Sequence, residues 1–181
     1  MRYISIEILR TLLKAEISTG KLMWNHRPKE LFATKRAFNT WNARWAGKEA
    51  FTALSSDGYF MGAIFGSTYR AHRIVWALHY GDWPDNQIDH INGDKTDNRV
   101  LNLRQASQME NNRNCALSKN NKSGYNGVYF DGRRNTWRAF ITINYKTISL
   151  GSYVGKEMAI AMRKNAEINY GFHENHGRKA A

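Results

Sequence analysis

The sequence predicts an α+β protein made of small modules, because helical and strand patterns occupy different stretches of one 181-residue chain. Apolar residues recur at helical spacing near the start of the chain and again over 71–79. Between 127 and 151, apolar and polar residues alternate in three short runs, which is typical of strands. The length suits two or three modules of roughly 50 to 70 residues, near the lower limit for independent folding.

The first helix is predicted over 4–16, and a turn at 18–20 separates it from a short strand at 21–24. Residues 25–48 are basic and aromatic without a clear period, so the sequence assigns them neither a fold nor a role. The apolar stripe of the first helix consists of Ile4, Ile8, Leu9, Leu12 and Leu13.

A hairpin is predicted around Ser55–Gly58, with a further turn at Gly66-Ser67. Residues 71–79 follow as a helix that buries Ile74, Val75 and Leu78, and the Gly-Asp-Trp-Pro run that begins at Gly81 ends it.

The segment from Gln87 to Asn114 is predicted to form a strand, a loop and a helix. Residues 87–90 read as the strand, 92–94 as a turn, and 107–114 as a helix with Ser107 as its N-cap. Polar residues 118–123 then suggest a linker. After it, 127–131, 136–143 and 147–151 are expected strands and 156–170 an alanine-rich helix, in the order β-β-β-α.

The formal net charge of +12 and the pI near 10.0 favour a polyanionic partner. Nucleic acid is expected rather than membrane, because no apolar run is long enough to span a bilayer. The charge is uneven: 1–60 carry +5, 61–115 carry 0 and 116–181 carry +7. The alternative is that a basic pI only keeps a small protein soluble.

One cysteine, Cys115, excludes an internal disulfide and a cysteine-rich zinc site. The charged start of the chain lacks the apolar core of a signal peptide. We therefore expect a cytoplasmic protein, and no obligate protein partner is evident in the sequence.

Asp89 and His90 stand side by side before an asparagine-rich loop, and Asn111 lies in the helix that follows. Carboxylate and amide oxygens suit a hard cation such as Mg²⁺. A neutral imidazole beside that ion can take a proton from water near pH 7. The alternative is that Asp89 is a turn residue and His90 an ordinary buried histidine.

The run QIDHINGDKTDNRVLNLRQASQMENNRN, residues 87–114, resembles the HNH (ββα-metal) nucleases, especially phage and intron homing endonucleases. The resemblance implies that His90 is the general base, Asp89 a metal ligand and Asn102 a brace of the loop. Asn111, nine residues after Asn102, matches the last residue of the HNH motif, which implies a second metal ligand. The motif is therefore His-Asn-Asn in this chain rather than His-Asn-His.

The same resemblance extends to neighbouring residues. Asn114, one helical turn after Asn111, would face the metal or a phosphate together with Arg113. His72 and Arg73 match a His-Arg pair common upstream in relatives, which implies a phosphate contact or a brace of the active site. Ordinary helix packing is the equal alternative for His72.

Residues 123–171 resemble the ethylene-response-factor (Apetala-type) DNA-binding domain, through Gly127-Val128, Trp137, Lys146, Leu150-Gly151 and the alanine-containing helix. That fold places a three-stranded sheet in the major groove. Trp137 could instead belong to the core, and the arginines could simply be solvated. The implied DNA contacts are Tyr129, Arg133, Arg134, Trp137, Arg138 and Lys146.

Together these observations predict an N-terminal α/β extension at 1–66, an HNH core at 67–116, a linker at 117–123, a DNA-binding module at 124–173 and a tail at 174–181. The expected activity is homing-like cleavage of double-stranded DNA with one Mg²⁺ (or Mn²⁺), nicking as a monomer. The alternatives are a non-catalytic DNA-binding regulator, a nuclease for packaging, restriction or toxicity, and an RNA target.

Overall fold

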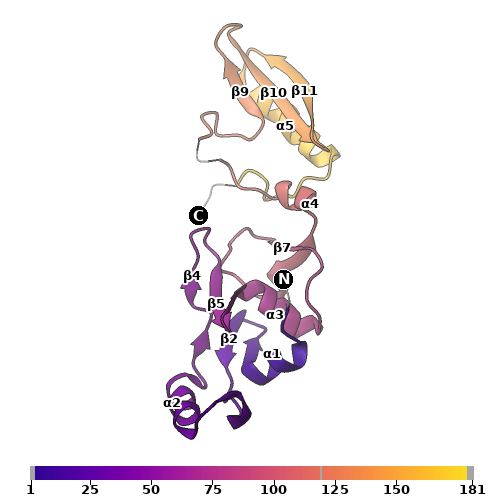
Figure 1. Cartoon of the computed structure of the whole chain (residues 1–181). Coiled ribbons are helices and arrows are strands. Elements are labelled where there is room, and N and C mark those ends of the chain that lie inside the picture. The colour runs from indigo at the N-terminus through magenta and orange to yellow at the C-terminus, as the bar shows by residue number, and fades with distance from the viewer. Residues whose placement is uncertain (1–2, 119, 179–181) are drawn as a thin grey trace. The chain divides into compact units, whose positions relative to one another are not determined.

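A computed structural model describes residues 3–118 and 120–178, which form two compact units, Met1–Gln105 and Ala106–Ala181 (Figure 1). Each unit mixes helices and strands, so the α+β class is confirmed. The predicted domain boundaries stay predictions, and parts of the linker (119) and of the tail (179–181) lie outside the described residues.

The first unit begins with helix α1 (Ile6–Leu12), which ends earlier than predicted. Leu13 is already extended and opens strand β1 (Leu13–Glu16), which pairs with β2 (Lys21–Trp24). The prediction of a single helix over 4–16 was therefore wrong, because Leu13, the last residue of its apolar stripe, is buried in a hairpin rather than along a helix. Strand β3 (Glu49–Ala50) completes this antiparallel sheet in the order β1-β2-β3.

The segment that the sequence left unassigned contains a short 3-10 helix, η1 (Lys29–Leu31), and helix α2 (Lys35–Trp45). Thr34 caps α2, since its side chain accepts a hydrogen bond from the Ala37 backbone N–H. The predicted hairpin is confirmed as β4 (Ala53–Leu54) and β5 (Phe60–Ile64), and β6 (Ser67–Arg70) continues the sheet.

Helix α3 (Ala71–Tyr80) packs at the centre of the first unit and ends at Gly81, which adopts a left-handed conformation. Ile74 and Val75 are fully buried, as predicted, and join a core that includes residues of α1, β1 and β2. The core therefore fixes α3 beside the strands that carry the candidate site.

The motif segment folds as predicted in outline. Strand β7 (Gln87–His90) pairs with β8 (Leu103–Ala106), and η2 (Val100–Asn102) lies in the loop between them. Helix α4 (Gln108–Asn112) follows with a capping box between Ser107 and Glu110. It is shorter than predicted, because Arg113 already closes it.

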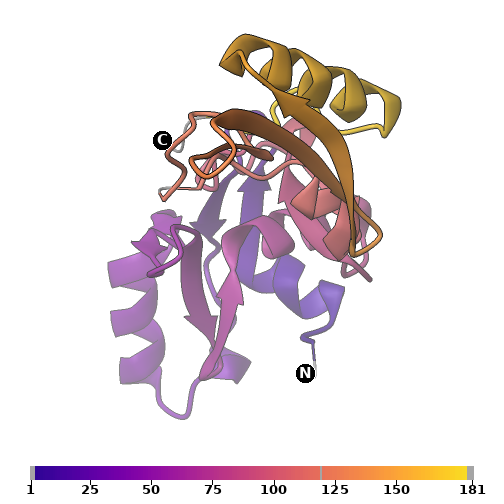
Figure 2. The same cartoon turned by 90° about the horizontal axis from the view of Figure 1, so that it is seen from above.

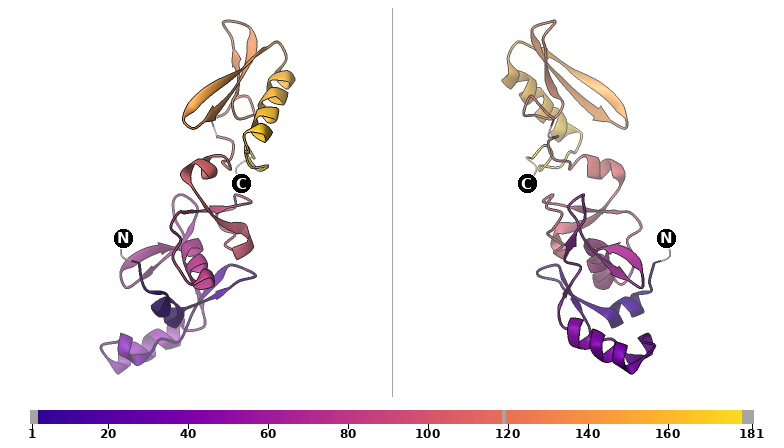
Figure 3. Two further views of the ribbon diagram at one scale, coloured as in Figure 1. Left: turned by 90° about the vertical axis from the view of Figure 1, so that its right-hand side faces the viewer. Right: turned by 60° about the vertical axis from the view of Figure 1, so that its left-hand side comes forward.

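In the second unit, β9 (Val128–Asp131), β10 (Thr136–Ile143) and β11 (Lys146–Tyr153) form an antiparallel sheet in the order β11-β10-β9. Helix α5 (Lys156–Asn169) lies along one face of this sheet (Figures 2 and 3). The predicted β-β-β-α order is confirmed. Across the described parts of both units, no helix has the length and apolar character to cross a membrane.

Candidate active site

The last two residues of β7, Asp89 and His90, are both buried in the first unit, with 6% and 3% of their surface exposed. Ile88 anchors the strand in the core, and pairing with β8 positions Arg104 beside Asp89. The Arg104 guanidinium donates from Nε (3.0 Å) and Nη2 (2.8 Å) to Oδ2 of Asp89. The carboxylate predicted to hold a metal thus already has a cationic partner.

The loop after β7 is held by the side chain of Asn102. Its Oδ1 accepts from the Asn92 backbone N–H (3.0 Å), and its Nδ2 donates to the Asp97 carbonyl (2.8 Å). Asp97 in turn accepts from the Arg99 guanidinium. Because these bonds join the two ends of the loop, Asn102 lies where a loop brace would act.

Asn98 is the loop residue that contacts the imidazole. Its side chain is 3% exposed, and its Oδ1 lies 3.0 Å from Nε2 of His90. An amide oxygen only accepts, so Nε2 carries the hydrogen and the basic lone pair of the neutral ring is on Nδ1. Gly20, at φ +72°, lies so close to the Asn98 backbone that the β1–β2 turn supports this loop.

His72 and Tyr59 pack against the His90 ring. The His72 ring centroid is 5.1 Å from that of His90, and the Tyr59 centroid is 5.0 Å and 5.7 Å from His72 and His90. Burial lowers the pKa of His72 to about 3, and Nδ1 of His72 is buried without a hydrogen-bond partner. Burial also lowers the pKa of His90, against the opposing effect of the Asn98 hydrogen bond and the nearby carboxylates. Both rings are therefore neutral at pH 7.

A bidentate ion pair fixes the segment that carries Tyr59. Arg70 donates to both carboxylate oxygens of Asp57 (2.9 and 2.8 Å), and these bonds hold the pKa of Asp57 well below its usual range. Lys95 donates to the Asp57 carbonyl and lies 5.0 Å from the centre of the Tyr59 ring. Tyr59 is thereby held beside the two histidines.

Arg73 turns away from this cluster. Its guanidinium donates to the carbonyls of Asn86 and Pro84 and to the Tyr3 hydroxyl. Three protein acceptors thus engage the group for which the sequence predicted a DNA contact.

Asn111 and Asn114 belong to the second unit. Asn111 lies in α4, and Asn114 is 2% exposed, with its Oδ1 accepting from Arg178 (3.0 Å). The guanidinium of Arg113 lies 5.7 Å from the centre of the Phe172 ring. The structure thus brings Asp89, Asn102 and His72 together with His90, whereas the candidate ligand Asn111 is on a separate unit.

The predicted DNA contacts of the second unit divide between the two faces of its sheet. Tyr129 and Arg138 are register partners and line a shallow pocket of about 350 Å³ with Phe140. Trp137, one residue along, packs against the core cluster instead, with Lys156 near its ring. The geometry favours core packing for Trp137. Arg133 and Arg134 lie in the turn between β9 and β10, and Lys146 opens β11.

Three site residues escaped the sequence-based prediction: Asn98, Tyr59 and Arg104. Asn98 lies in the asparagine-rich loop after His90, and this place in the sequence was a usable signal. Arg104 and Tyr59 gave no signal, because strand pairing and hairpin packing bring them to the site.

The donor atoms limit which metal the site could hold. Over residues 3–118 and 120–178, no group of three or more His, Cys, Asp and Glu side chains could hold a metal ion. The candidate donor in the first unit is the Asp89 carboxylate, and a single carboxylate suits a hard cation that keeps much of its water. Both Arg104 bonds end on Oδ2 of Asp89.

The site consists of a strand that ends in a buried Asp-His pair and the braced loop that follows it. Residues 69–113 match the HNH endonuclease family, which supports the predicted HNH core. The chain is also similar to Protein 3.8 of Escherichia phage T7, with 36% identity over 78 residues, 42% of this chain. The aligned part spans 64% of that phage protein. No solved structure matches the chain significantly.

Proposed function

We propose that the protein is a divalent-metal-dependent DNA endonuclease of the HNH type. The observation that carries this proposal is the state of His90: a buried, neutral imidazole whose Nε2 is engaged by Asn98, in a stretch that matches HNH endonucleases. Such a ring suits general-base chemistry on a phosphodiester.

His90 would take a proton from the attacking water through Nδ1. The Asn98 hydrogen bond selects the tautomer and holds the ring plane, while His72 and Tyr59 restrict its movement. Because the pKa of His90 is lowered, the ring is available as a base at neutral pH. The contact between the His72 and His90 rings supports a bracing role for His72 rather than a phosphate contact.

Asp89 would hold the cation, Mg²⁺ or Mn²⁺. When bound, the ion would supply charge stabilisation for the phosphate and the leaving oxygen. Arg104 would keep the Asp89 carboxylate ionised and oriented through its two bonds to Oδ2.

The substrate would be double-stranded DNA. The basic second unit would bind it through the face of β9 and β10 that carries Tyr129 and Arg138, in the manner of an ethylene-response-factor-like module. One site per chain would nick one strand, which fits a homing-like nuclease acting as a monomer.

The test is cleavage of supercoiled plasmid and phage DNA with Mg²⁺, with Mn²⁺ and with chelator. His90→Ala should lose roughly 10²–10⁴-fold in nicking rate, the share of a general base, and should still bind DNA. His79→Ala is the matched control, because His79 is exposed at the end of α3. Full activity of His90→Ala, or cleavage that survives chelator, would refute the proposal.

The Asp89–Arg104 ion pair favours one alternative, a non-catalytic DNA-binding regulator. In that case the guanidinium replaces the cation at the carboxylate. Tight DNA binding with no cleavage, and no stabilisation of the protein by Mg²⁺, would support the regulator.

A further inference from the structure

Helix α2 presents a basic, solvent-exposed face that the candidate active site does not use. Residues 31–48 contain four Lys or Arg and no Asp or Glu. Asn42 is the only buried residue of the helix. Residues four apart in sequence are neighbours on the surface of an α-helix, so six exposed residues form two adjacent rows along one side of α2. These rows are Lys35, Asn39 and Ala43, and Arg36, Thr40 and Arg44.

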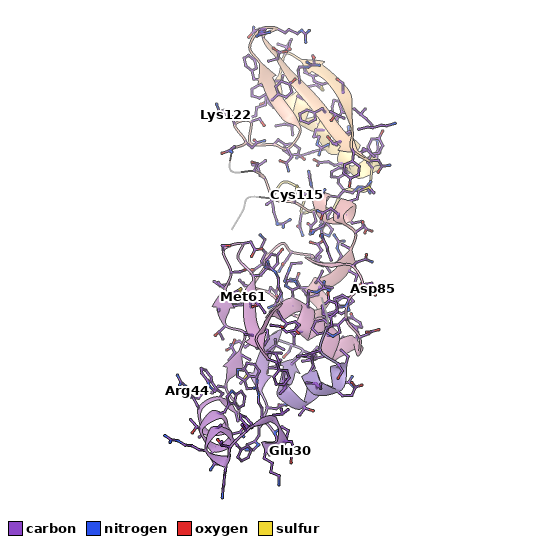
Figure 4. All side chains as sticks on the ribbon, viewed as in Figure 1. Glu30, Arg44, Met61, Asp85, Cys115 and Lys122 are labelled. Carbon is purple, nitrogen blue, oxygen red and sulfur yellow. The ribbon has the colours of Figure 1, made fainter. Side chains whose placement is uncertain are left out.

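The opposite side of α2 is fixed by aromatic and polar contacts rather than by the apolar core. The Arg27 guanidinium lies 3.8 Å from the centre of the Trp41 ring and 4.8 Å from that of Trp24. Asn42 accepts from the Arg27 backbone N–H (2.8 Å) and donates to its carbonyl (3.1 Å). The helix is therefore held firmly while its basic face stays open, at the end of the first unit where Figures 1 and 4 show α2 and Arg44.

Among residues 3–118 and 120–178, no carboxylate forms an ion pair on this face. Glu49, the nearest acid after the helix in sequence, is paired with Lys21 at 3.0 Å. Within the described residues, Lys35, Arg36 and Arg44 form no ion pair with a carboxylate. Three uncompensated cations on one helical face create a local positive field that attracts a polyanion.

We propose that the exposed face of α2 is a second DNA-binding surface, in which Lys35, Arg36 and Arg44 contact the phosphates of duplex DNA. The choice of DNA rests on the proposed nuclease function; the surface itself rests on the helix. The rows between the cations hold only small or polar side chains, Asn39, Thr40 and Ala43, which let a helix approach a groove closely. The exposed ring of Trp45 lies 5.0 Å from the Arg44 guanidinium at the end of the helix. A membrane surface would need a stripe of large apolar side chains along the cations, and the two rows contain no large apolar side chain.

The test compares two double variants that remove equal charge from the first unit. Lys35→Ala/Arg36→Ala removes one lysine and one arginine of α2. The matched control, Arg10→Ala/Lys14→Ala, removes one of each from exposed positions in α1 and β1. Both are made in the His90→Ala protein, and binding to a fluorescent DNA duplex is measured in chelator over a series of salt concentrations.

The α2 variant should bind DNA severalfold more weakly, and its slope of log affinity against log salt should fall by about 1 for each phosphate that the helix no longer neutralises. The control should keep the wild-type slope, and circular dichroism should show that both variants are folded. An equal fall in affinity for the two variants would mean that net charge alone matters, and would overturn the proposal. Tighter binding of an RNA duplex of the same length would overturn it as well.

The outcome is independent of the nuclease proposal. If the α2 variant binds DNA normally while the wild-type protein nicks plasmid, only the α2 surface is refuted. If the α2 variant binds DNA more weakly and the wild type cuts nothing, the surface stands and the nuclease function fails.

Discussion

Acidification should destabilise the first unit through His72. Its pKa is about 3 in the folded protein against 6.5 in an unfolded chain, because burial disfavours the charged ring. Below pH 6.5 the unfolded state therefore binds more protons, and the stability present above that pH is lost as the pH falls. In this window the free energy of unfolding falls by about 1.4 kcal/mol for each pH unit. His72 alone should therefore lower the free energy of unfolding by about 2 kcal/mol between pH 6.5 and pH 5.

Urea unfolding of wild type and His72→Phe at pH 7 and pH 5 measures this contribution. Phenylalanine keeps a ring between Tyr59 and His90 but cannot titrate, and it removes the unpartnered Nδ1. Tryptophan fluorescence suits the assay because five of the six tryptophans lie in the first unit. His90 contributes to both proteins, so the difference between them isolates His72. An equal loss of stability in the two proteins would refute the reasoning.

Three further substitutions test the supports of the site and a strained turn. Asn98→Ala should lower the nicking turnover about 10–100-fold, because His90 loses the hydrogen-bond partner that orients its ring. The KM for DNA should change little. An unchanged turnover would exclude Asn98 as a positioning residue. Gly20→Ala should lower the urea midpoint, because a Cβ at φ +72° would collide with the Asn98 backbone; a cost of roughly 1–3 kcal/mol is expected, and a neutral effect would contradict this close approach. Tyr145→Gly should raise the melting temperature, with a gain of up to about 1 kcal/mol, because φ is +63° at Tyr145 in the exposed β10–β11 turn; a lower melting temperature would show that the ring stabilises the turn.

The strands and helices that local pattern specifies could be predicted from the sequence. The alternation over 136–143 and the Ser107 cap both correspond to elements that the structure contains. The first helix was overextended because Leu13 continues the apolar stripe, while its backbone is set by pairing with Trp24 across the hairpin. Helix α2 was missed because Arg27 and aromatic rings hold it, and such contacts leave no apolar period.

The candidate site was predictable only where its residues are close in sequence. Asp89 and His90 are adjacent, and the match over 69–113 supports the motif around them. The partners that set the chemistry of these two residues come from elsewhere: Arg104 from the paired strand and Tyr59 from the β4–β5 hairpin. Their positions depend on tertiary packing, which no local pattern encodes.

Under the proposed nuclease function, the charges around His90 assign DNA affinity and turnover to different parts of the chain. Three acids of the first unit near this ring or its supports are each paired with an arginine: Asp57 with Arg70, Asp89 with Arg104 and Asp97 with Arg99. Two of these pairs, Asp89–Arg104 and Asp97–Arg99, lie wholly within 61–115, the stretch that carries no net charge. A locally balanced site adds little long-range attraction for DNA, so affinity must come from the basic stretches on either side. Variants at His90 or Asn98 should therefore change rate at constant affinity, and variants on α2 should change affinity and its salt dependence.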